Sequence, residues 1–256
     1  MSKSNTVLLT GGTGNIGSQL VSDLLENNFQ VITTSRSDKN IEIFQNRFDG
    51  FYKNGLLHLI RVDLEEKDSS QKILAYLEKN NLQIQALVNN ARNTNYLKLN
   101  DQNETDRTNW FGEFLLDVVV AYELSVALTN INNSKLKNII NISSMYGMVA
   151  PTPALYKDFK KESPVNYGVA KAALIQLTKE LAVRLADNNI RVNCISYGGV
   201  EGRADEDFKK RYGKYCPAGR MLKRDEVYGA INFLLSEGSS GMTGHNLVID
   251  GGWTTW

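Results

Sequence analysis

Short apolar runs alternate with longer amphipathic segments along this chain, and the alternation restricts the folds that it can adopt. The runs are rich in Val, Ile and Leu and have the length of strands buried on both faces, as in a parallel sheet. They are Thr6–Leu9, Gln30–Thr34, Leu57–Val62, Ala86–Asn89, Asn138–Ile142, Arg191–Ile195 and Asn246–Ile249. The segments with helical periodicity are Ile16–Glu26, Ser70–Lys79, Arg107–Leu128, Tyr167–Ala186 and Arg224–Leu235. This order predicts an α/β fold with right-handed crossovers.

The expected architecture is a single domain over residues 1–256, a Rossmann-type doubly wound parallel sheet of about seven strands with helices on both faces. No linker-like, low-complexity or repeated stretch divides the 256 residues. In such sheets ligands bind beyond the carboxyl ends of the strands. The loops that follow the strands are therefore where we expect the chemistry.

Charge and composition exclude several classes of function. The 29 basic and 28 acidic residues give a net charge of +1, which offers no electrostatic reason to expect a nucleic acid or an anionic membrane as partner. No apolar run approaches the roughly 20 residues that span a bilayer, and the N-terminus lacks the apolar core of a signal peptide. Neither the cysteines nor the histidines form a metal-ligand cluster. We therefore expect a cytoplasmic protein with reduced thiols and no bound metal.

A glycine-rich turn, Thr10–Gly17, joins the first predicted strand to the first predicted helix. Glycines let the backbone turn tightly and approach a pyrophosphate, and the helix N-terminus supplies free N–H groups and a favourable dipole. A turn that only needs positive φ would also carry glycines, but the place at the first β-α junction favours dinucleotide binding. The residues expected at the cofactor are Gly11, Thr13, Gly14, Asn15, Ile16 and Gly17.

The end of the second predicted strand bears on which dinucleotide binds. An acidic residue about 20 positions past the glycines commonly holds the ribose hydroxyls of NAD, whereas an arginine there pairs with the 2′-phosphate of NADP. This chain has Ser35 and Arg36, with no carboxylate before Asp38. NADP(H) is therefore favoured over NAD(H), unless Arg36 is only a solvated loop residue. Asp63, just past the third strand, either accepts a hydrogen bond from the adenine amino group or caps the following turn.

Tyr167 and Lys171 lie four residues apart at the start of a long predicted helix, which puts them on one helical face. A phenol titrates at about pH 10, and a nearby ammonium stabilises the phenolate and lowers its pKa. Such a phenol can exchange a proton with a carbonyl or an alcohol while a nicotinamide exchanges the hydride. Tyr156 and Lys160 share the spacing, but they lie in a charged stretch between prolines without a comparable helix. The later pair is therefore favoured.

Two serines, Ser143 and Ser144, follow the predicted strand Asn138–Ile142. At the carboxyl end of a strand, a hydroxyl can donate a hydrogen bond to a substrate oxygen. The alternative is that both serines only satisfy the backbone of the loop.

In this order and spacing, the motifs resemble those of the short-chain dehydrogenase/reductase family, and the resemblance covers essentially the whole chain. The matching features are the glycine turn, Asp63, Asn89–Ala91, Ser143–Ser144, Tyr167 with Lys171, and Gly244–Gly252. The resemblance implies that residues 1 to about 140 bind the dinucleotide and that about 141–256 carry catalysis and substrate binding.

The resemblance also implies a role for individual residues. Ser144 would orient the substrate carbonyl, Tyr167 would give or take the proton, and Lys171 would tune Tyr167 and hold the ribose. The further cofactor contacts that it implies are Leu64, Asn90, Ala91, Gly198 and Val200, and the expected substrate contacts are Arg92, Met145 and Tyr156.

The chain departs from the family pattern at several positions. Asn15 replaces a usual glycine, and its side chain is expected to crowd the phosphate. Val119 falls where the family's catalytic asparagine is expected, and losing that group would slow turnover. Arg92 replaces another glycine and could reach an anionic substrate. Tyr197 replaces the usual proline of the loop after the sixth strand, and Gly202 stands where a threonine commonly contacts the nicotinamide.

Within the family, the chain looks most like the oxidoreductases of flagellin-glycan and sialic-acid-like sugar pathways (the PtmA-like group). That likeness rests on Asn89–Tyr96, Ser144–Pro151 and Ser163–Tyr167. The expected function is to reduce a carbonyl, or oxidise a secondary alcohol, on a polar metabolite such as an amino-sugar derivative. The long segment between Ser144 and Tyr167 would form a lid over it. The alternative is a catalytically weakened relative that acts as a nucleotide-binding sensor or partner subunit.

The expected partners are a small-molecule substrate and further copies of the same chain. The two helical segments Arg107–Leu128 and Tyr167–Ala186 correspond to those that pack the family's members into homodimers and homotetramers. Their apolar residues could equally form core within one chain.

Overall fold

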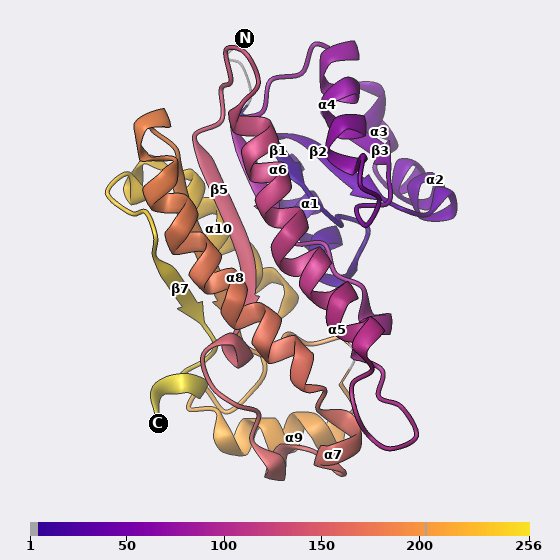
Figure 1. The fold of residues 1–256 in the computed structure, drawn as a ribbon, viewed down its shortest axis with the longest axis vertical. Helices are drawn as coiled ribbons and strands as arrows, with labels where there is room; N and C mark the ends of the chain where they lie inside the picture. Colours follow the sequence, from indigo (N-terminus) through magenta and orange to yellow (C-terminus); the bar gives the residue numbers. More distant parts are fainter. Residues whose placement is uncertain (1–4, 203) are drawn as a thin grey trace.

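The computed structural model describes residues 5–202 and 204–256, in which helices cover both faces of a parallel sheet (Figure 1). The strands are β1 (Thr6–Leu9), β2 (Gln30–Ser35), β3 (Leu57–Arg61), β4 (Ala86–Asn89), β5 (Asn138–Ser144), β6 (Arg191–Tyr197) and β7 (Asn246–Ile249). They pair in parallel as a 7-stranded sheet in the order β3-β2-β1-β4-β5-β6-β7, which confirms the predicted doubly wound fold. The order reverses between β1 and β4, so the carboxyl ends of these strands open the crevice in which such sheets bind ligands.

Ten of the helices have the α geometry. They are α1 (Asn15–Glu26), α2 (Asp38–Arg47), α3 (Asp49–Lys53), α4 (Ser69–Lys79), α5 (Arg107–Phe114), α6 (Val120–Thr129), α7 (Phe159–Glu162), α8 (Val165–Arg184), α9 (Glu206–Tyr215) and α10 (Tyr228–Leu235). Helices α2, α3, α7 and α9 were not predicted from the sequence. Of these, α2 buries only Phe44 and α9 only Tyr212, so neither shows the apolar stripe by which a helix is recognised.

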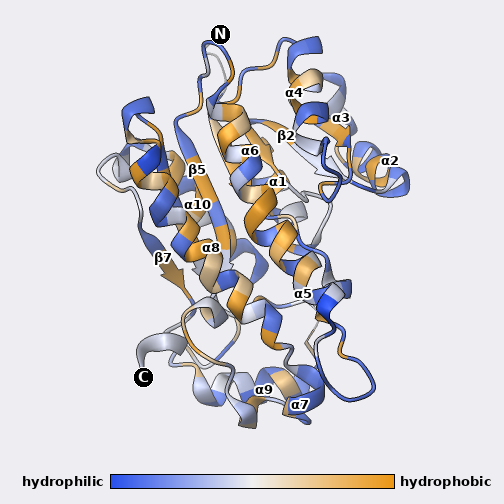
Figure 2. Ribbon diagram, in the orientation of Figure 1, coloured by the Kyte–Doolittle hydropathy of each residue, from blue (hydrophilic) through white to orange (hydrophobic). Residues whose placement is uncertain are grey.

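The strands bury side chains on both faces, which explains their continuous apolar runs. Val7 and Leu9 point to the face that α1 and α10 cover, where they join a cluster with Leu24. Leu8 points to the opposite face, where α4, α6 and α8 pack and where Leu124 is fully buried. Figure 2 shows apolar residues along the sheet and along the helices that pack on it. The sheet is thereby fixed between two cores, and its carboxyl edge is left to the loops.

The predicted helix Arg107–Leu128 is interrupted by a π-helix. Helix α5 ends at Phe114, the π-helix occupies Leu115–Val119, and α6 begins at Val120. Such wider turns are rare and often mark functional sites. Here the turn carries a buried charged residue, Asp117.

Beyond the carboxyl edge of the sheet, α7 and α9 form a small separate layer (Figure 1). Its core contains Met145, Leu155, Tyr212 and Trp253, with the rings of Tyr212 and Trp253 stacked at a centroid distance of 4.4 Å. Across the part of the chain that the structure describes, no helix is long and apolar enough to cross a membrane.

Candidate active site

A cavity of about 660 Å³ lies at the carboxyl ends of the strands and brings most of the predicted site residues together. Its volume is within the range of about 300–1,000 Å³ that is usual for cofactor and ligand sites. The predicted residues that line it are Gly11, Thr13, Gly14, Asn15, Ile16, Gly17, Ser35, Arg36, Asp63, Leu64, Asn90, Ala91, Arg92, Ser144, Met145, Tyr167, Gly198 and Val200. Lys171 and Tyr156 are not among its lining residues.

The glycine turn packs so tightly against its neighbours that side chains cannot be accommodated at several positions. Gly11 has φ +67°, and a Cβ there would lie 2.7 Å from the Cα of Ala91. A Cβ on Gly12 would lie 2.2 Å from Thr33 Oγ1, whereas one on Gly14 would meet only the Gly11 carbonyl oxygen, at 3.2 Å. Gly14 thus borders the open cavity, and α1 begins directly after it. This cradle of backbone fits the pyrophosphate of a dinucleotide.

We predict that Gly17→Ala damages the turn. The new Cβ would lie 2.3 Å from the Gly11 carbonyl oxygen and 2.8 Å from the Cα of Gly12. Because backbone atoms cannot yield as a flexible side chain does, the free energy of unfolding should fall by about 1–3 kcal/mol, and NADPH binding should weaken. Thermal denaturation and NADPH fluorescence measure the two effects. Gly50→Ala on α3 is the control, since nothing lies within 4 Å of its Cβ; equal behaviour of both variants would contradict the packing argument.

Two departures from the family pattern, Asn15 and Tyr197, line the cavity and also have hydrogen-bond partners elsewhere in the fold. Asn15 is the first residue of α1, and its side-chain oxygen accepts a hydrogen bond from Arg224. Arg224, the first residue of the 3-10 helix Arg224–Val227, thus holds a side chain that borders the cavity. Tyr197 is 3% exposed and its hydroxyl donates to the Val227 carbonyl oxygen, so its ring is part of the core.

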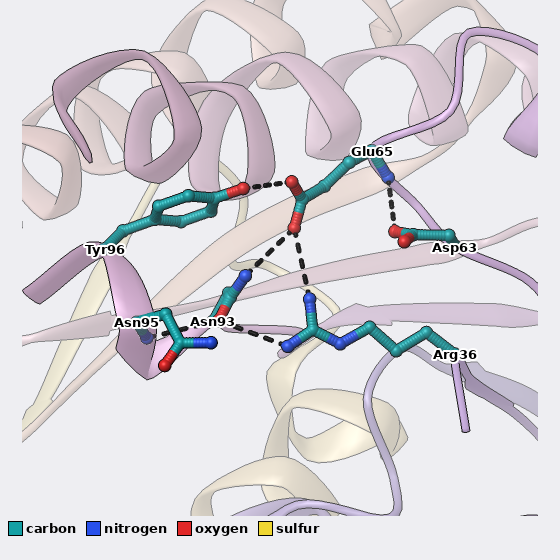
Figure 3. A network of polar contacts seen from close by, with 6 residues as sticks. All are labelled: Arg36, Asp63, Glu65, Asn93, Asn95 and Tyr96. Atoms are coloured by element: carbon teal, nitrogen blue, oxygen red, sulfur yellow. Dashed lines mark hydrogen bonds and ion pairs between the residues drawn. The ribbon is translucent and has the colours of Figure 1, made fainter. Parts of the chain in front are cut away.

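Arg36 is held in a network of polar contacts that sequence spacing could not reveal (Figure 3). Its guanidinium lies 3.5 Å from Glu65 Oε1 and donates to Asn93 Oδ1 at 3.2 Å. Glu65 also accepts from Asn93 Nδ2 at 3.2 Å and from the hydroxyl of Tyr96. Burial and the Glu65 carboxylate raise the pKa of Tyr96 to about 12, so its hydroxyl stays protonated and donates. Half of the Arg36 side chain remains exposed, and it lines the cavity.

Asp63 caps the turn after β3, because its Oδ1 accepts a hydrogen bond from the backbone N–H of Glu65 at 3.1 Å (Figure 3). It also lines the cavity. The capping function that the sequence left open is therefore present.

The two serines at the end of β5 have different surroundings. Ser143 donates to the Lys171 carbonyl oxygen at 2.9 Å and so ties β5 to α8. Ser144 lines the cavity, and its Oγ accepts a hydrogen bond from the backbone N–H of Tyr146 at 3.2 Å. Its hydroxyl hydrogen is thus available to a group in the cavity.

Tyr167 and Lys171 lie on one face of α8, with the Lys171 Nζ 5.9 Å from the centroid of the Tyr167 ring. Lys171 is 6% exposed and donates to the Ile142 carbonyl oxygen at 3.0 Å. The guanidinium of Arg92 lies over the same phenol ring, 4.1 Å from its centroid. Tyr167 is thus flanked by two cations, of which the sequence identified only Lys171 in this role.

Asp117 was not predicted as a site residue from the sequence. Its Oδ2 lies 3.0 Å from Lys171 Nζ, and both side chains are almost fully buried. The predicted position for the family's asparagine, Val119, is two residues further along the π-helix. The structure thus brings Asp117 of the π-helix to Lys171, where the family pattern led us to expect Val119.

Glu113 was likewise not recognised, although it lies one helical turn before Asp117. It is 2% exposed, and its Oε1 lies 3.8 Å from Arg92 Nε. Burial, together with the charge of Asp117, raises the pKa of Glu113 to about 7, while Arg92 and Lys171 oppose the shift. A carboxyl group beside the predicted reactive tyrosine therefore titrates near neutral pH.

Tyr156, an expected substrate contact, lies behind the cavity wall. Its hydroxyl donates to the Tyr146 hydroxyl at 2.9 Å, and Tyr146 is the residue that lines the cavity. The Tyr146 and Tyr167 rings meet edge to face, with centroids 6.5 Å apart. Tyr156 therefore contacts the cavity only indirectly, through Tyr146. Lys160, four residues after Tyr156, lies on the short helix α7.

Comparison with known proteins identifies the family. A family model described as enoyl-(acyl carrier protein) reductase matches residues 12–254. The chain belongs to the short-chain dehydrogenase/reductase family. It is 28% identical to post-translational flagellin modification protein A of Campylobacter coli, over 99% of both chains. It is 30% identical to a 3-oxoacyl-[acyl-carrier-protein] reductase of Chlamydia pneumoniae, covering 97% of this chain and 96% of that one.

The solved structures agree. A short-chain dehydrogenase from Leptospira borgpetersenii, with bound NAD+, superposes with a TM-score of 0.83 at 29% identity and covers 98% of this chain and 93% of that chain. The chain is therefore an NAD(P)-dependent oxidoreductase of this family, and the predicted enzyme class is confirmed.

Proposed function

We propose that this enzyme reduces a carbonyl, or oxidises a secondary alcohol, on a polar metabolite, with NADP(H) as the coenzyme and Tyr167 as the proton donor or acceptor. The observation that carries the proposal is the surroundings of Tyr167: its phenol borders a cavity of about 660 Å³, with Lys171 on its own helix and Ser144 at the end of β5. The test is a screen of carbonyl and alcohol substrates, ketosugars first, for turnover that depends on Tyr167.

Each residue of the site has its own role in the proposed reaction. The glycine turn and the N-terminus of α1 would hold the pyrophosphate, and the nicotinamide, when bound, supplies or accepts the hydride. Ser144 donates a hydrogen bond that orients the substrate oxygen. Tyr167 gives that oxygen a proton in reduction and removes one in oxidation. Lys171, fixed by Ile142 and Asp117, stabilises the negative phenolate that remains after reduction.

A polar and anionic substrate is supported by Arg92. Its side chain lines the cavity, is 32% exposed, and lies over the Tyr167 ring. A guanidinium at that place can bind a carboxylate in a planar, bidentate manner. An amino-sugar derivative fits this chemistry, and the chain is similar to a flagellin modification protein over 99% of its length.

The preference for NADP(H) is supported by Arg36 at the end of β2. We predict that Arg36→Ala weakens NADPH binding about tenfold and leaves NADH binding unchanged, because a half-exposed, charge-assisted contact to the 2′-phosphate is lost. Fluorescence titration with each coenzyme measures this. Arg61→Ala is the matched control, since Arg61 is equally exposed but pairs with Asp38. Tighter binding of NADH by the parent protein would overturn the preference.

Assembly into homodimers or homotetramers is part of the proposal. The outer faces of α5, α6 and α8 expose large apolar side chains. They are Phe111, Phe114, Tyr122, Val165, Val169 and Val183. Exposed apolar side chains gathered on neighbouring helices are typical of protein interfaces, and light scattering of the purified protein measures the assembly directly.

A further inference from the structure

A chain of alternating charges surrounds Tyr167. Lys171 pairs with Asp117 at 3.0 Å, Glu113 lies one turn from Asp117 on α5, and Arg92 reaches Glu113 at 3.8 Å. The guanidinium of Arg92 in turn lies over the phenol ring of Tyr167, 4.1 Å from the ring centroid. We call Arg92, Glu113, Asp117 and Lys171 the charge cluster. With both carboxylates ionised its net charge is zero, and with one proton added it is +1.

The charge cluster holds a carboxylate oxygen that the protein leaves without a hydrogen bond. Among the described residues, Glu113 Oε1 is buried and has no hydrogen-bond partner, and the buried amide oxygen of Asn89 next to the cluster has none either. A small cavity of about 10 Å³ lies between Asn89, Asp117 and Lys171, about the size of one water molecule with polar partners. A buried carboxylate with so few donors binds a proton readily.

We propose that Glu113 is a positioning residue for Tyr167: by binding or releasing one proton it switches the net charge of the cluster between +1 and zero, and this charge controls how readily the phenol gives up its hydrogen. Protonated Glu113 leaves two cations beside the phenol opposed by one carboxylate, which favours the phenolate. Ionised Glu113 restores neutrality and favours the phenol. The inference deepens the proposed function and rests on it only in giving Tyr167 the proton-transfer role.

The groups that face Glu113 come from every element packed against it. Asp117 lies on the π-helix, Arg92 on the loop after β4, and Lys171 with Tyr167 on α8. Burial and Asp117 raise the pKa of Glu113 to about 7, against an ordinary value of 4.5. The folded protein therefore holds a proton that the unfolded chain releases, so its stability falls as the pH rises from about 4.5 to about 7. Glu113→Gln should remove this dependence.

The deciding experiment is NMR of the protein with 13C at the tyrosine Cζ and the glutamate Cδ, in the absence of substrate, over a range of pH. Glu113→Gln and Tyr167→Phe assign the two signals. We expect Glu113 to titrate near neutral pH, and the Tyr167 signal to shift toward phenolate at a pH about one unit lower, or more, in Glu113→Gln than in the parent protein. Glu113→Asp, which keeps the charge, should restore most of the parent midpoint. Glu123→Gln, at an exposed position on α6, should change neither signal.

Titration of Glu113 at its ordinary pH, or an unchanged Tyr167 midpoint in Glu113→Gln, would overturn the inference. In the loaded enzyme, the pH dependence of kcat should lose its inflection near neutral pH in the same variant, while the KM for the coenzyme stays within about twofold. The NMR readout requires no turnover. Full activity of Tyr167→Phe would thus refute the proposed function while the coupling of Glu113 to Tyr167 could still be measured.

Discussion

Tyr167→Phe is expected to lower turnover by about 10²–10⁴-fold, the usual contribution of a general acid or base. The substitution removes one hydroxyl and keeps the ring, so the contacts with Arg92 and Tyr146 are retained. The melting temperature and the affinity for NADPH should therefore stay close to those of the parent protein. Consumption of NADPH with a substrate from the ketosugar screen measures turnover, and coenzyme fluorescence measures binding.

Tyr156→Phe is the matched control for this prediction. Tyr156 has a lysine at the same spacing, but its hydroxyl donates to Tyr146 and lies outside the cavity lining. We expect turnover within a few-fold of the parent protein, because only one neutral hydrogen bond is lost. If the two variants lost activity equally, the assignment of the reactive tyrosine would be wrong.

Lys171→Met is expected to impair both stability and turnover. Lys171 is buried, and its removal leaves the Asp117 carboxylate and the Ile142 carbonyl oxygen without their donor. Breaking a buried ion pair by removing one partner costs about 3–5 kcal/mol, which for a chain of this size corresponds to a fall in melting temperature of roughly 10 °C. Turnover should fall by about 10²–10⁴-fold, since the phenolate loses its stabilising charge.

A second substitution separates these two effects. Adding Asp117→Asn to Lys171→Met removes the unpaired buried charge, so most of the lost stability should return. Turnover should not return, because no cation is restored beside Tyr167. Thermal denaturation and steady-state kinetics of both single variants and of the double variant complete the cycle. Recovery of turnover in the double variant would show that Lys171 has only a structural role.

The sequence by itself determined the sheet and the cradle for the coenzyme. The apolar runs marked all the strands because a parallel strand is buried on both faces and tolerates few polar residues. The glycine turn could also be recognised from the sequence, because the close approach of the backbone to Ala91 and Thr33 permits only glycine there. Tyr167 and Lys171 could be placed together because both belong to one regular helix, where a spacing of four fixes their common face.

The tertiary structure alone decided how the charges around Tyr167 are arranged. Asp117 reaches Lys171 from a π-helix that interrupts the segment predicted as one continuous helix. Glu113 and Arg92 come from different elements, as do Arg36 and Glu65, and no spacing along the chain relates them. A buried charge is recognisable only when its partner and its burial are known, since the same residue in water would be an ordinary surface group.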